Sequence, residues 1–498
     1  MSPRCGSSLR QRRLILPALM TGVAALAIAR SAWSQVAEEP QGAVQPPPFL
    51  FVPTLGLEEA FTDNARLTDV DRRWDGITRA LAELEADVNS GSVKGHLLAS
   101  VTYDAYARNA DLSGASFTAD GSGSVVLEPG RLTFDADGAV VNTRTSNFGE
   151  PAIDRSGIPD RTQVATFQMG PRLTTTIGDF ADLTAAARFA QVFYSAASGS
   201  VLDTPLPQND GVGQLIGSLD TTKRIGWLQL VTSGSYERDQ HGFASSTAVQ
   251  SAYIAVLPRL RIIGRAGYDS VQQPGLLDIN AGLVSVGLEY ALNSASTISL
   301  EGGSRYNRGN WVAKATISLR DRLFLEGQYT ESIAPDQLIF IGSFQDYVQQ
   351  TRNLPSPIVP TQFAPDGNVY NQTSYNKILS GKTAYKFNYQ TIRFSVFAID
   401  RQFVTLRTHD RTLSTSVAYS REIHPDLTLT IEGDYQQTLD SPVYAPSRSY
   451  QAQVQALYRI NPSTECSISY AFAGSRQTAG AGESIYDNTM LITIHKRI

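Results

Sequence analysis

Five histidines are the residues of this sequence best suited to proton transfer or metal binding near neutral pH. They are His96, His241, His409, His424 and His495. Nucleophilic catalysis needs a serine or cysteine beside a histidine that a carboxylate or amide orients, and a metal centre needs several ligands at short spacing. Neither pattern surrounds any of the five. We therefore expect no catalysis, no cofactor and no metal, although spacing alone does not say whether His241 and His409 meet acidic residues.

Two other stretches resemble ligand-binding motifs without completing them. Asp69, Asp71 and Asp75 have the spacing of carboxylates in a calcium loop, but the glycine and the bidentate glutamate of that loop are missing. Gly121-Ser-Gly123-Ser lacks the third glycine of a dinucleotide-binding fingerprint. We interpret the first stretch as a solvated acidic loop and the second as small residues at close strand packing.

The composition indicates strands rather than helices. Charged residues make up only 18% of the chain and Met occurs 4 times, whereas there are 21 Tyr and 20 Phe. Aromatic residues are enriched in strands. The two cysteines are Cys5, which lies in a segment that we expect to be removed, and Cys466, so the mature chain cannot form an internal disulfide. The formal net charge is −5, and no basic patch points to a nucleic-acid partner.

The N-terminus has the pattern of an export signal. Residues 1–13 carry four arginines and no acidic residue, an apolar stretch follows at Leu14–Ala29, and Ala32-Trp33-Ser34 supplies small residues at the cleavage positions. The alternative is a membrane-anchoring helix, but the apolar stretch contains a proline and is shorter than the ~20 residues that a span needs. We predict a signal peptide at 1–34 and a Pro-rich periplasmic lead-in at 35–50.

Residues after position 50 alternate between apolar and polar with a period of two. In one stretch Val93, Gly95, Leu97, Ala99, Val101 and Tyr103 alternate with Lys94, His96, Ser100, Thr102 and Asp104. This period is typical of strands with one apolar and one polar face. No later stretch is apolar for long enough to form a transmembrane helix, and a closed barrel is the other structure that can span a bilayer.

The connections between the predicted strands alternate between short and long. Tight turns such as Glu128-Pro129-Gly130 and Asn461-Pro462-Ser463 are followed by longer polar connections such as Asn142–Arg161 and Arg238–Ser246. A soluble β-sandwich would not require this asymmetry, whereas a membrane barrel has short periplasmic turns and long outer loops. We therefore predict an all-β protein, a transmembrane antiparallel up-and-down β-barrel over residues 51–498. We expect an outer-membrane location and an even number of about 22 strands, in the range of roughly 18 to 24, which leaves both termini in the periplasm.

Several segments resemble a known family of outer-membrane proteins. They are the first strand, Pro53-Thr-Leu-Gly-Leu-Glu-Glu-Ala-Phe-Thr-Asp-Asn64, the hairpin segment Gly178-Asp-Phe-Ala-Asp-Leu-Thr184, and repeated hairpins whose strands end in Tyr. The chain resembles the β-barrel porin 2 family, which includes barrels associated with exopolysaccharide and exosortase systems. The resemblance covers roughly residues 50–498. It implies an outer-membrane pore, with polysaccharide transport in some members, and it supplies no catalytic residues.

Three groups of polar residues are predicted to line the pore. Each group shares one face of one strand: Arg259, Arg261 and Arg265; Asp135 and Asp137; and Gln451, Gln453 and Gln455. Fixed charges in a pore select solutes by sign, and mixed signs argue against strong ion selectivity. Amide rows suit hydroxyl-rich sugar chains. The alternative for any one residue is that it only keeps the wall rigid and hydrated.

The longest predicted connection spans residues 334–377 and is too long to be a simple link. Within it, four apolar residues have weakly helical spacing: Leu338, Phe340, Phe344 and Val348. We hypothesise that this connection folds inward to constrict or gate the pore. A surface cap or a partner-docking element is the alternative.

The expected function is passive transport of an exported polysaccharide through the outer membrane. The expected surroundings are outer-membrane lipid, periplasmic polysaccharide-export machinery and, during insertion, the barrel-assembly machinery. Two alternatives stay open. One is a general diffusion porin for small solutes, and the other is a surface structural or adhesive protein whose barrel is a closed anchor.

Overall fold

The computed structural model describes residues 48–498 apart from nine internal gaps. The gaps are 145–151, 158–160, 196–208, 222–225, 320–321, 336–372, 405–407, 442–445 and 478–483. The predicted signal peptide and nearly all of the predicted lead-in lie outside the described residues. The first strand begins at Phe49, two residues before the predicted start of the barrel.

The described residues form 22 antiparallel strands. They are β1 (Phe49–Thr62), β2 (Asp75–Asn89), β3 (Val93–Tyr106), β4 (Gly114–Glu128), β5 (Leu132–Arg144), β6 (Arg161–Ile177), β7 (Ala181–Tyr194), β8 (Asp210–Asp220), β9 (Leu228–Asp239), β10 (Ala244–Leu257), β11 (Leu260–Gln273), β12 (Leu277–Asn293), β13 (Ser296–Arg305), β14 (Arg308–Leu319), β15 (Leu323–Pro335), β16 (Thr373–Phe387), β17 (Gln390–Phe403), β18 (His409–His424), β19 (Leu427–Asp440), β20 (Ser447–Asn461), β21 (Thr464–Gln477) and β22 (Ser484–Arg497).

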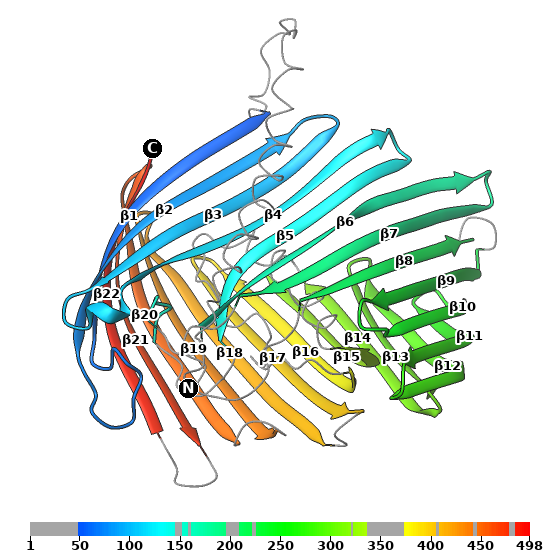
Figure 1. The fold of residues 1–498 in the computed structure, drawn as a ribbon. Helices are drawn as coiled ribbons and strands as arrows, with labels where there is room; N and C mark the ends of the chain where they lie inside the picture. The colour runs from blue at the N-terminus through cyan, green and yellow to red at the C-terminus, as the bar shows by residue number, and fades with distance from the viewer. Residues whose placement is uncertain are drawn as a thin grey trace, which may run out of the picture. The chain divides into compact units, whose positions relative to one another are not determined.

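The strands form one closed sheet. Each pairs with its neighbours in the sequence, and β22 also pairs with β1, with Thr54 opposite Arg497 and Thr62 opposite Thr489. In Figure 1 the last strand (red) runs beside the first (blue), which closes the ring. The predicted all-β antiparallel barrel with an even strand number is confirmed.

Helical structure is minor in the described part of the chain. One 3-10 turn, Ala110–Leu112, lies between β3 and β4.

Among the described residues, no helix is both long enough and apolar enough to cross a bilayer.

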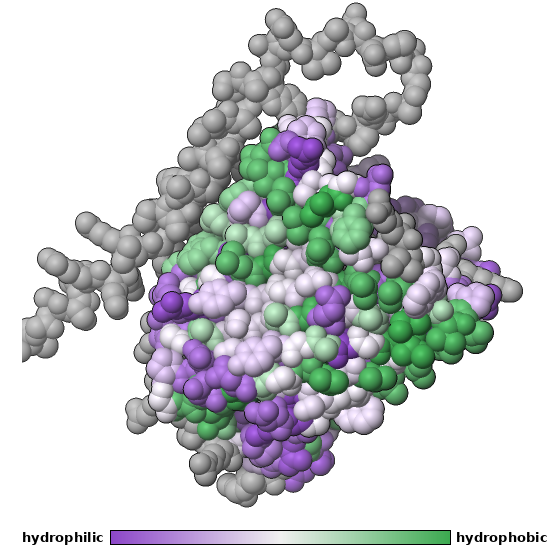
Figure 2. All heavy atoms as spheres, turned by 90° about the vertical axis from the view of Figure 1, so that its right-hand side faces the viewer, coloured by the Kyte–Doolittle hydropathy of each residue, from purple (hydrophilic) through white to green (hydrophobic). Residues whose placement is uncertain are grey.

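The two faces of the wall differ in polarity, as the period of two predicted. On β3, which pairs with β2 and β4, Val101 and Tyr103 point outward and are 47% and 51% exposed. Asp104 of the same strand points inward and is 1% exposed. Exposed large apolar side chains recur on the outer face of most strands, and the space-filling view shows broad apolar patches over one side of the wall (Figure 2). A closed sheet with an apolar outside and a polar inside is the architecture of barrels that span a membrane.

The two ends of the barrel have different connections. At one end, here called the turn end, the connections are mostly two or three residues long, as at 258–259 and 462–463. The other end, here called the loop end, carries the longer connections, including 63–74, 145–160 and 336–372. The alternation of short and long connections is therefore correct in its main features.

Three connections at the loop end are shorter than the alternation suggests. The predicted long connection Arg238–Ser246 is wrong, because β9 continues to Asp239 and β10 begins at Ala244. Residues 274–276 and Tyr306-Asn307 are also tight. Tyr306 and Asn307 both have positive φ, 56° and 59°, which is the geometry of a two-residue hairpin turn that matches strand twist.

Candidate functional site

The space that 22 strands enclose is the first feature of a candidate conduit. With a strand spacing of about 4.8 Å and a tilt of about 40°, a circular barrel of 22 strands is roughly 40 Å across at the backbone. Inward side chains occupy part of that width. Within residues 48–498 as described, the chain consists of strands and the connections that join them.

Asp135 and Asp137 lie on the inward face of β5. They lie opposite Ser124 and Ser122 of β4, on the face away from the exposed Val125. Each contacts a side chain of the adjacent strand β6. Asp135 lies 3.1 Å from the Arg172 guanidinium, and Asp137 accepts a hydrogen bond of 3.2 Å from the Gln168 amide. The charge of Asp135 is therefore compensated by Arg172, whereas Asp137 is held by a neutral amide.

Arg261 and Arg265 on β11 also face the lumen, and both are paired. Arg261 lies 3.3 Å from Glu289 of β12, and Arg265 lies 2.9 Å from Glu301 of β13. Arg259 departs from the prediction. The pairing of β10 with β11 shifts between Ala255 and Leu257, β11 begins at Leu260, and Arg259 lies in the turn at the turn end. The predicted three-arginine face is thus a pair of lumen arginines and one turn residue.

Gln451, Gln453 and Gln455 on β20 point inward, because Ala452 and Val454 between them are exposed on the outside. Gln455 donates a hydrogen bond of 3.3 Å to the Ser467 hydroxyl of β21, which in turn pairs with the Thr493 hydroxyl of β22 at 2.7 Å. The amide row therefore continues into a row of hydroxyls. The three predicted groups lie on separate parts of the wall, and the structure does not bring them together.

The predicted gating residues Leu338, Phe340, Phe344 and Val348 lie outside the described residues. A different connection, that between β5 and β6, contacts the inner wall at Ala152–Gly157. We call this segment the inner loop. Its contacts run from β20 and β22 to β2 and β3, all at the loop end.

Asp487 of β22 is the main anchor of the inner loop. Its Oδ2 accepts the Ala152 backbone N–H at 2.7 Å and lies 3.1 Å from the Arg155 guanidinium, and both charged side chains are 0% exposed. Its Oδ1 accepts a hydrogen bond of 2.5 Å from the Thr62 hydroxyl of β1. Arg155 also donates to the Asn64 carbonyl at 3.0 Å. One carboxylate therefore joins β22, β1 and the inner loop.

A second buried group holds the other end of the inner loop. Arg79 of β2 lies 2.6 Å from Asp104 of β3 and 3.2 Å from Glu58 of β1. Asp104 also accepts the Ser156 backbone N–H at 2.6 Å, and Arg79 donates to the Asp154 carbonyl. On the β20 side, Gln451 donates to the Ala152 carbonyl at 2.8 Å. The inner loop and its anchors are the functional candidates that sequence reasoning missed, apart from Gln451.

The acidic stretch at Asp69–Asp75 forms no shared ligand cluster in the structure. Asp75 is buried and accepts hydrogen bonds from the backbone N–H groups of Arg108 and Asn109 and from the Asn109 amide. Asp71 pairs with Arg73. Asp75 thus fastens the 107–113 connection to β2.

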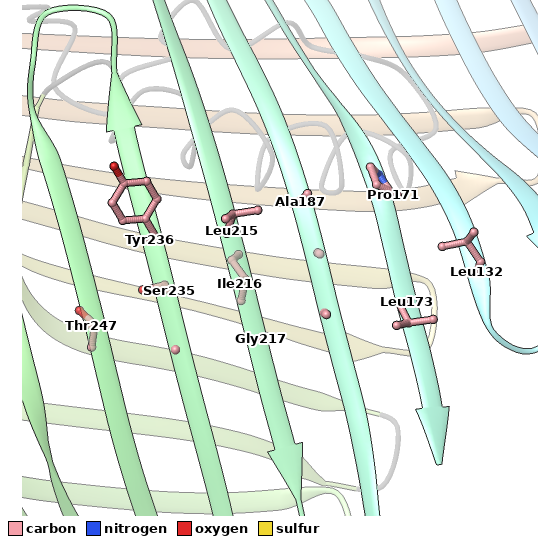
Figure 3. Close-up of a pocket in the computed structure, with 13 residues that line it drawn as sticks. Leu132, Pro171, Leu173, Ala187, Leu215, Ile216, Gly217, Ser235, Tyr236 and Thr247 are labelled. Atoms are coloured by element: carbon pink, nitrogen blue, oxygen red, sulfur yellow. The ribbon is translucent and has the colours of Figure 1, made fainter. Parts of the chain in front are cut away.

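An apolar groove of about 610 Å³ lies over β5 to β10 (Figure 3). Leu215 and Tyr236 at its rim are 55% and 41% exposed, and the small residues Ala185, Ala187 and Gly217 leave space between them. The β6–β7 pairing skips Gly170 and Pro171 beside the groove, since proline has no N–H for the ladder. The exposed rim places the groove on the outer surface, outside the lumen.

Comparison with known proteins relates the chain to solved barrels. No family model matches the chain. No curated protein matches it either. The structure resembles the siderophore receptor PirA from Acinetobacter baumannii at 8% identity with a TM-score of 0.50, covering 90% of this chain and 80% of that chain. It also matches a mutant of the ferric enterobactin receptor PfeA from Pseudomonas aeruginosa (11% identity, TM-score 0.47, 90% and 80% covered) and the FrpB iron transporter from Neisseria meningitidis (12%, 0.47, 90% and 81%). At 8% identity the likeness to PirA concerns the fold.

Proposed function

We propose that this protein is a passive outer-membrane conduit for an exported polysaccharide, in line with its resemblance to the β-barrel porin 2 family. The observation that carries the proposal is a closed 22-stranded barrel with an apolar outside and a polar inner wall on which several charges are paired. An apolar band of this extent is stable only against lipid. The proposed activity includes no covalent step and no cofactor.

The inner wall favours a neutral, hydroxyl-rich cargo over a simple ion. Asp135 and Arg261 are each paired with an opposite charge on the adjacent strand, and Arg265 is paired with Glu301 two strands away. Paired charges leave little net field to select ions by sign. The Gln451–Gln455 row and the neighbouring hydroxyls Ser467 and Thr493 offer donors and acceptors without charge, which can exchange hydrogen bonds with a sugar chain as it passes.

A small-solute diffusion porin is the second candidate function. A lumen of the size expected for 22 strands favours it, because such a width admits small nutrients whatever else passes. The proposed partners of the conduit are outer-membrane lipid, the barrel-assembly machinery during insertion and periplasmic polysaccharide-export machinery. The solved structures named above are of receptors and transporters for iron compounds, and at 8–12% identity they carry no argument for an iron chelate as the cargo of this chain.

Efflux from vesicles separates the two functions. The full-length protein is reconstituted into liposomes loaded with a small fluorescent dye and with neutral labelled oligosaccharides of increasing length. We expect release of the dye and of long oligosaccharides, with slower oligosaccharide release after the triple change Gln451→Ala, Gln453→Ala and Gln455→Ala. Release of the dye alone would favour the diffusion porin. Retention of both would contradict transport and favour a closed anchor.

A further inference from the structure

We infer that the loop end of β8 and β9 carries a site for one divalent transition-metal cation, formed by Asp210, Asp239 and His241. One carboxylate oxygen from each aspartate and one imidazole nitrogen lie within 4.8 Å of one another. This inference does not depend on the identity of the transported molecule.

The register of the sheet brings the two aspartates together. Asp210 opens β8, Asp239 ends β9, and Asp239 lies opposite Val212, two residues along from Asp210. A spacing of two returns a strand to the same face, so both carboxylates lie on one face of the wall. His241 follows in the tight 240–243 connection. Sequence inspection had left open whether this histidine meets acids, and in the structure it does.

The geometry of each ligand is fixed by its own contacts. Asp239 accepts the backbone N–H groups of His241 and Phe243 at 2.9 and 2.8 Å, which holds its carboxylate and the connection together. The Asp210 Oδ1 lies 3.1 Å from the His241 Nδ1. Asp210 is 1% exposed, and its Oδ2 is buried without a hydrogen-bond partner.

The Asp210 and Asp239 carboxylates differ from most buried carboxylates of the described wall in having no guanidinium partner. The buried carboxylates that pair with a guanidinium include Asp104 with Arg79, Asp269 with Arg305, Glu301 with Arg265, Asp410 with Arg401 and Asp487 with Arg155. Asp75 and Glu331 have no described ion pair, but Asp75 accepts hydrogen bonds from Asn109, and Glu331 accepts them from the phenols of Tyr329 and Tyr375. No described ion pair joins Asp210 or Asp239 to an arginine or a lysine. Two adjacent buried carboxylates, one with an oxygen that has no hydrogen-bond partner, destabilise the folded state, and a bound cation would offset that destabilisation.

The ligand types indicate the class of cation. Two carboxylate oxygens with one imidazole nitrogen suit Zn²⁺ or Mn²⁺, whereas Ca²⁺ prefers oxygen ligands only. Ligand bonds of about 2.1 Å place neighbouring ligand atoms roughly 3.0 to 3.4 Å apart, and the Asp210–His241 distance of 3.1 Å falls in that range. The His241 side chain is 39% exposed, so solvent can reach the ion and supply its remaining ligands.

A second acid and histidine cluster provides the control. Glu85, Asp87 and His96 also group together, but all three are partly exposed and none of their polar atoms is a buried orphan. His96 lies 2.7 Å from Asp87. His409 with Asp400 is a simpler matched pair at the loop end, again 3.1 Å apart but 48% and 36% exposed. We assign no ion to either group.

The test uses full-length protein purified in detergent without a histidine tag and stripped with a chelator. Zn²⁺ and Mn²⁺ are titrated by calorimetry, and Co²⁺ is followed by its visible absorption, which reports nitrogen and oxygen ligands directly. We expect one saturable site, weakened roughly 100-fold or more by Asp210→Asn or by His241→Gln. His96→Gln and His409→Gln are expected to leave it unchanged.

Thermal unfolding gives an independent measurement, because the effect of chelation on the Tm can be compared between the wild type and a variant that binds metal poorly. Chelation is expected to lower the Tm of the wild type, because a bound cation stabilises the folded state. It is expected to leave the Tm of Asp210→Asn unchanged, because that variant has lost one of the two carboxylates and binds no cation. Absence of a saturable site, or equal loss of binding in His96→Gln, would overturn the assignment. A Tm insensitive to metal in the wild type would also overturn it.

Discussion

Two regions of the inner wall differ in how deeply their charged side chains are buried. Where β20–β22 and β1–β3 meet, the charges are buried under the inner loop, and Arg155 and Asp487 are 0% exposed. Along β5–β6 and β11–β13, ion pairs such as Arg172–Asp135 and Arg261–Glu289 stay partly exposed to the lumen. The first region uses charge to hold a segment of chain in place, and the second uses it to keep a wide space hydrated and nearly neutral.

The consequence is a difference in energy scale. Removing one partner of a buried ion pair leaves an uncompensated charge and typically costs about 3 to 5 kcal/mol. Exposed pairs are screened and contribute about 0 to 1 kcal/mol. The same substitution should therefore act on stability in one region and on permeation in the other.

The largest effect is expected at Asp487. Asp487→Ala removes the acceptor for Thr62, Ala152 and Arg155 at once, and we expect a loss of roughly 3 to 5 kcal/mol in the free energy of unfolding. Hydrogen exchange should show loss of protection at Ala152–Gly157. Asp135→Ala is the matched control and should leave both quantities nearly unchanged. Unaltered protection of the inner loop in Asp487→Ala would show that Asp487 is not its anchor.

The second effect concerns Arg79, which compensates two carboxylates. We expect Arg79→Met to destabilise the barrel by several kcal/mol, because Asp104 and Glu58 stay buried without it. Adding Asp104→Leu should recover part of that loss, since one unpaired charge then disappears. A double-mutant cycle measured by urea unfolding checks this. Strict additivity of the two changes would argue against coupling between Arg79 and Asp104.

A third buried patch at the loop end extends the comparison to apolar packing. Tyr306, in the connection between β13 and β14, packs against four buried residues from other parts of the chain: Phe243, Val271, Ile333 and Tyr375. Burial raises the pKa of the Tyr306 phenol from its ordinary value of 10.0 to about 12.

This shift stabilises the folded state below pH 10, and the contribution is lost as pH rises from 10 to about 12. We expect the wild type to lose more stability over that interval than Tyr306→Phe, which has no phenol to ionise. Urea unfolding of both proteins at pH 9, 10, 11 and 12 measures the difference. An equal decline in the two proteins would contradict the role of Tyr306.

The smallest effect on stability is expected at the exposed lumen pairs. Arg261→Gln should change the free energy of unfolding by less than about 1 kcal/mol, because the pair with Glu289 is exposed. It should, however, shift the reversal potential toward cation selectivity, since Glu289 is left uncompensated. Asp135→Asn should shift it the opposite way. Identical reversal potentials in all three proteins would place these residues away from the ion path.

Much of the barrel can be predicted because the alternation of apolar and polar residues is visible within the sequence of each strand. The alternation in Val93–Tyr103 identifies an outer and an inner face without any knowledge of the neighbouring strands, and the alternation around Gln451–Gln455 likewise indicates which side chains share a face. The ends of strands are less well defined by the pattern. Arg259 lies in the two-residue turn 258–259, one residue before β11 begins at Leu260, and alternation alone does not locate a strand end to a single residue.

The inner loop was not predictable, because its contacts join distant parts of the sequence. Ala152 and Asp487 are separated by 335 positions, and Gln451 and Ala152 by 299. No local pattern distinguishes Asp487 from any other aspartate at a strand end. The cluster of Asp210, Asp239 and His241 was not predictable for the same reason, since Asp210 begins β8, whereas Asp239 ends β9 and His241 lies in the connection after it.

Single-channel recording from the full-length protein in a planar bilayer tests the central claim most directly. A wide and charge-compensated lumen should give stepwise conductance with weak ion selectivity, larger steps in Asp487→Ala, and concentration-dependent block by neutral oligosaccharides. Flat traces from both wild type and Asp487→Ala would contradict the conduit and leave a membrane-anchored barrel with a closed lumen.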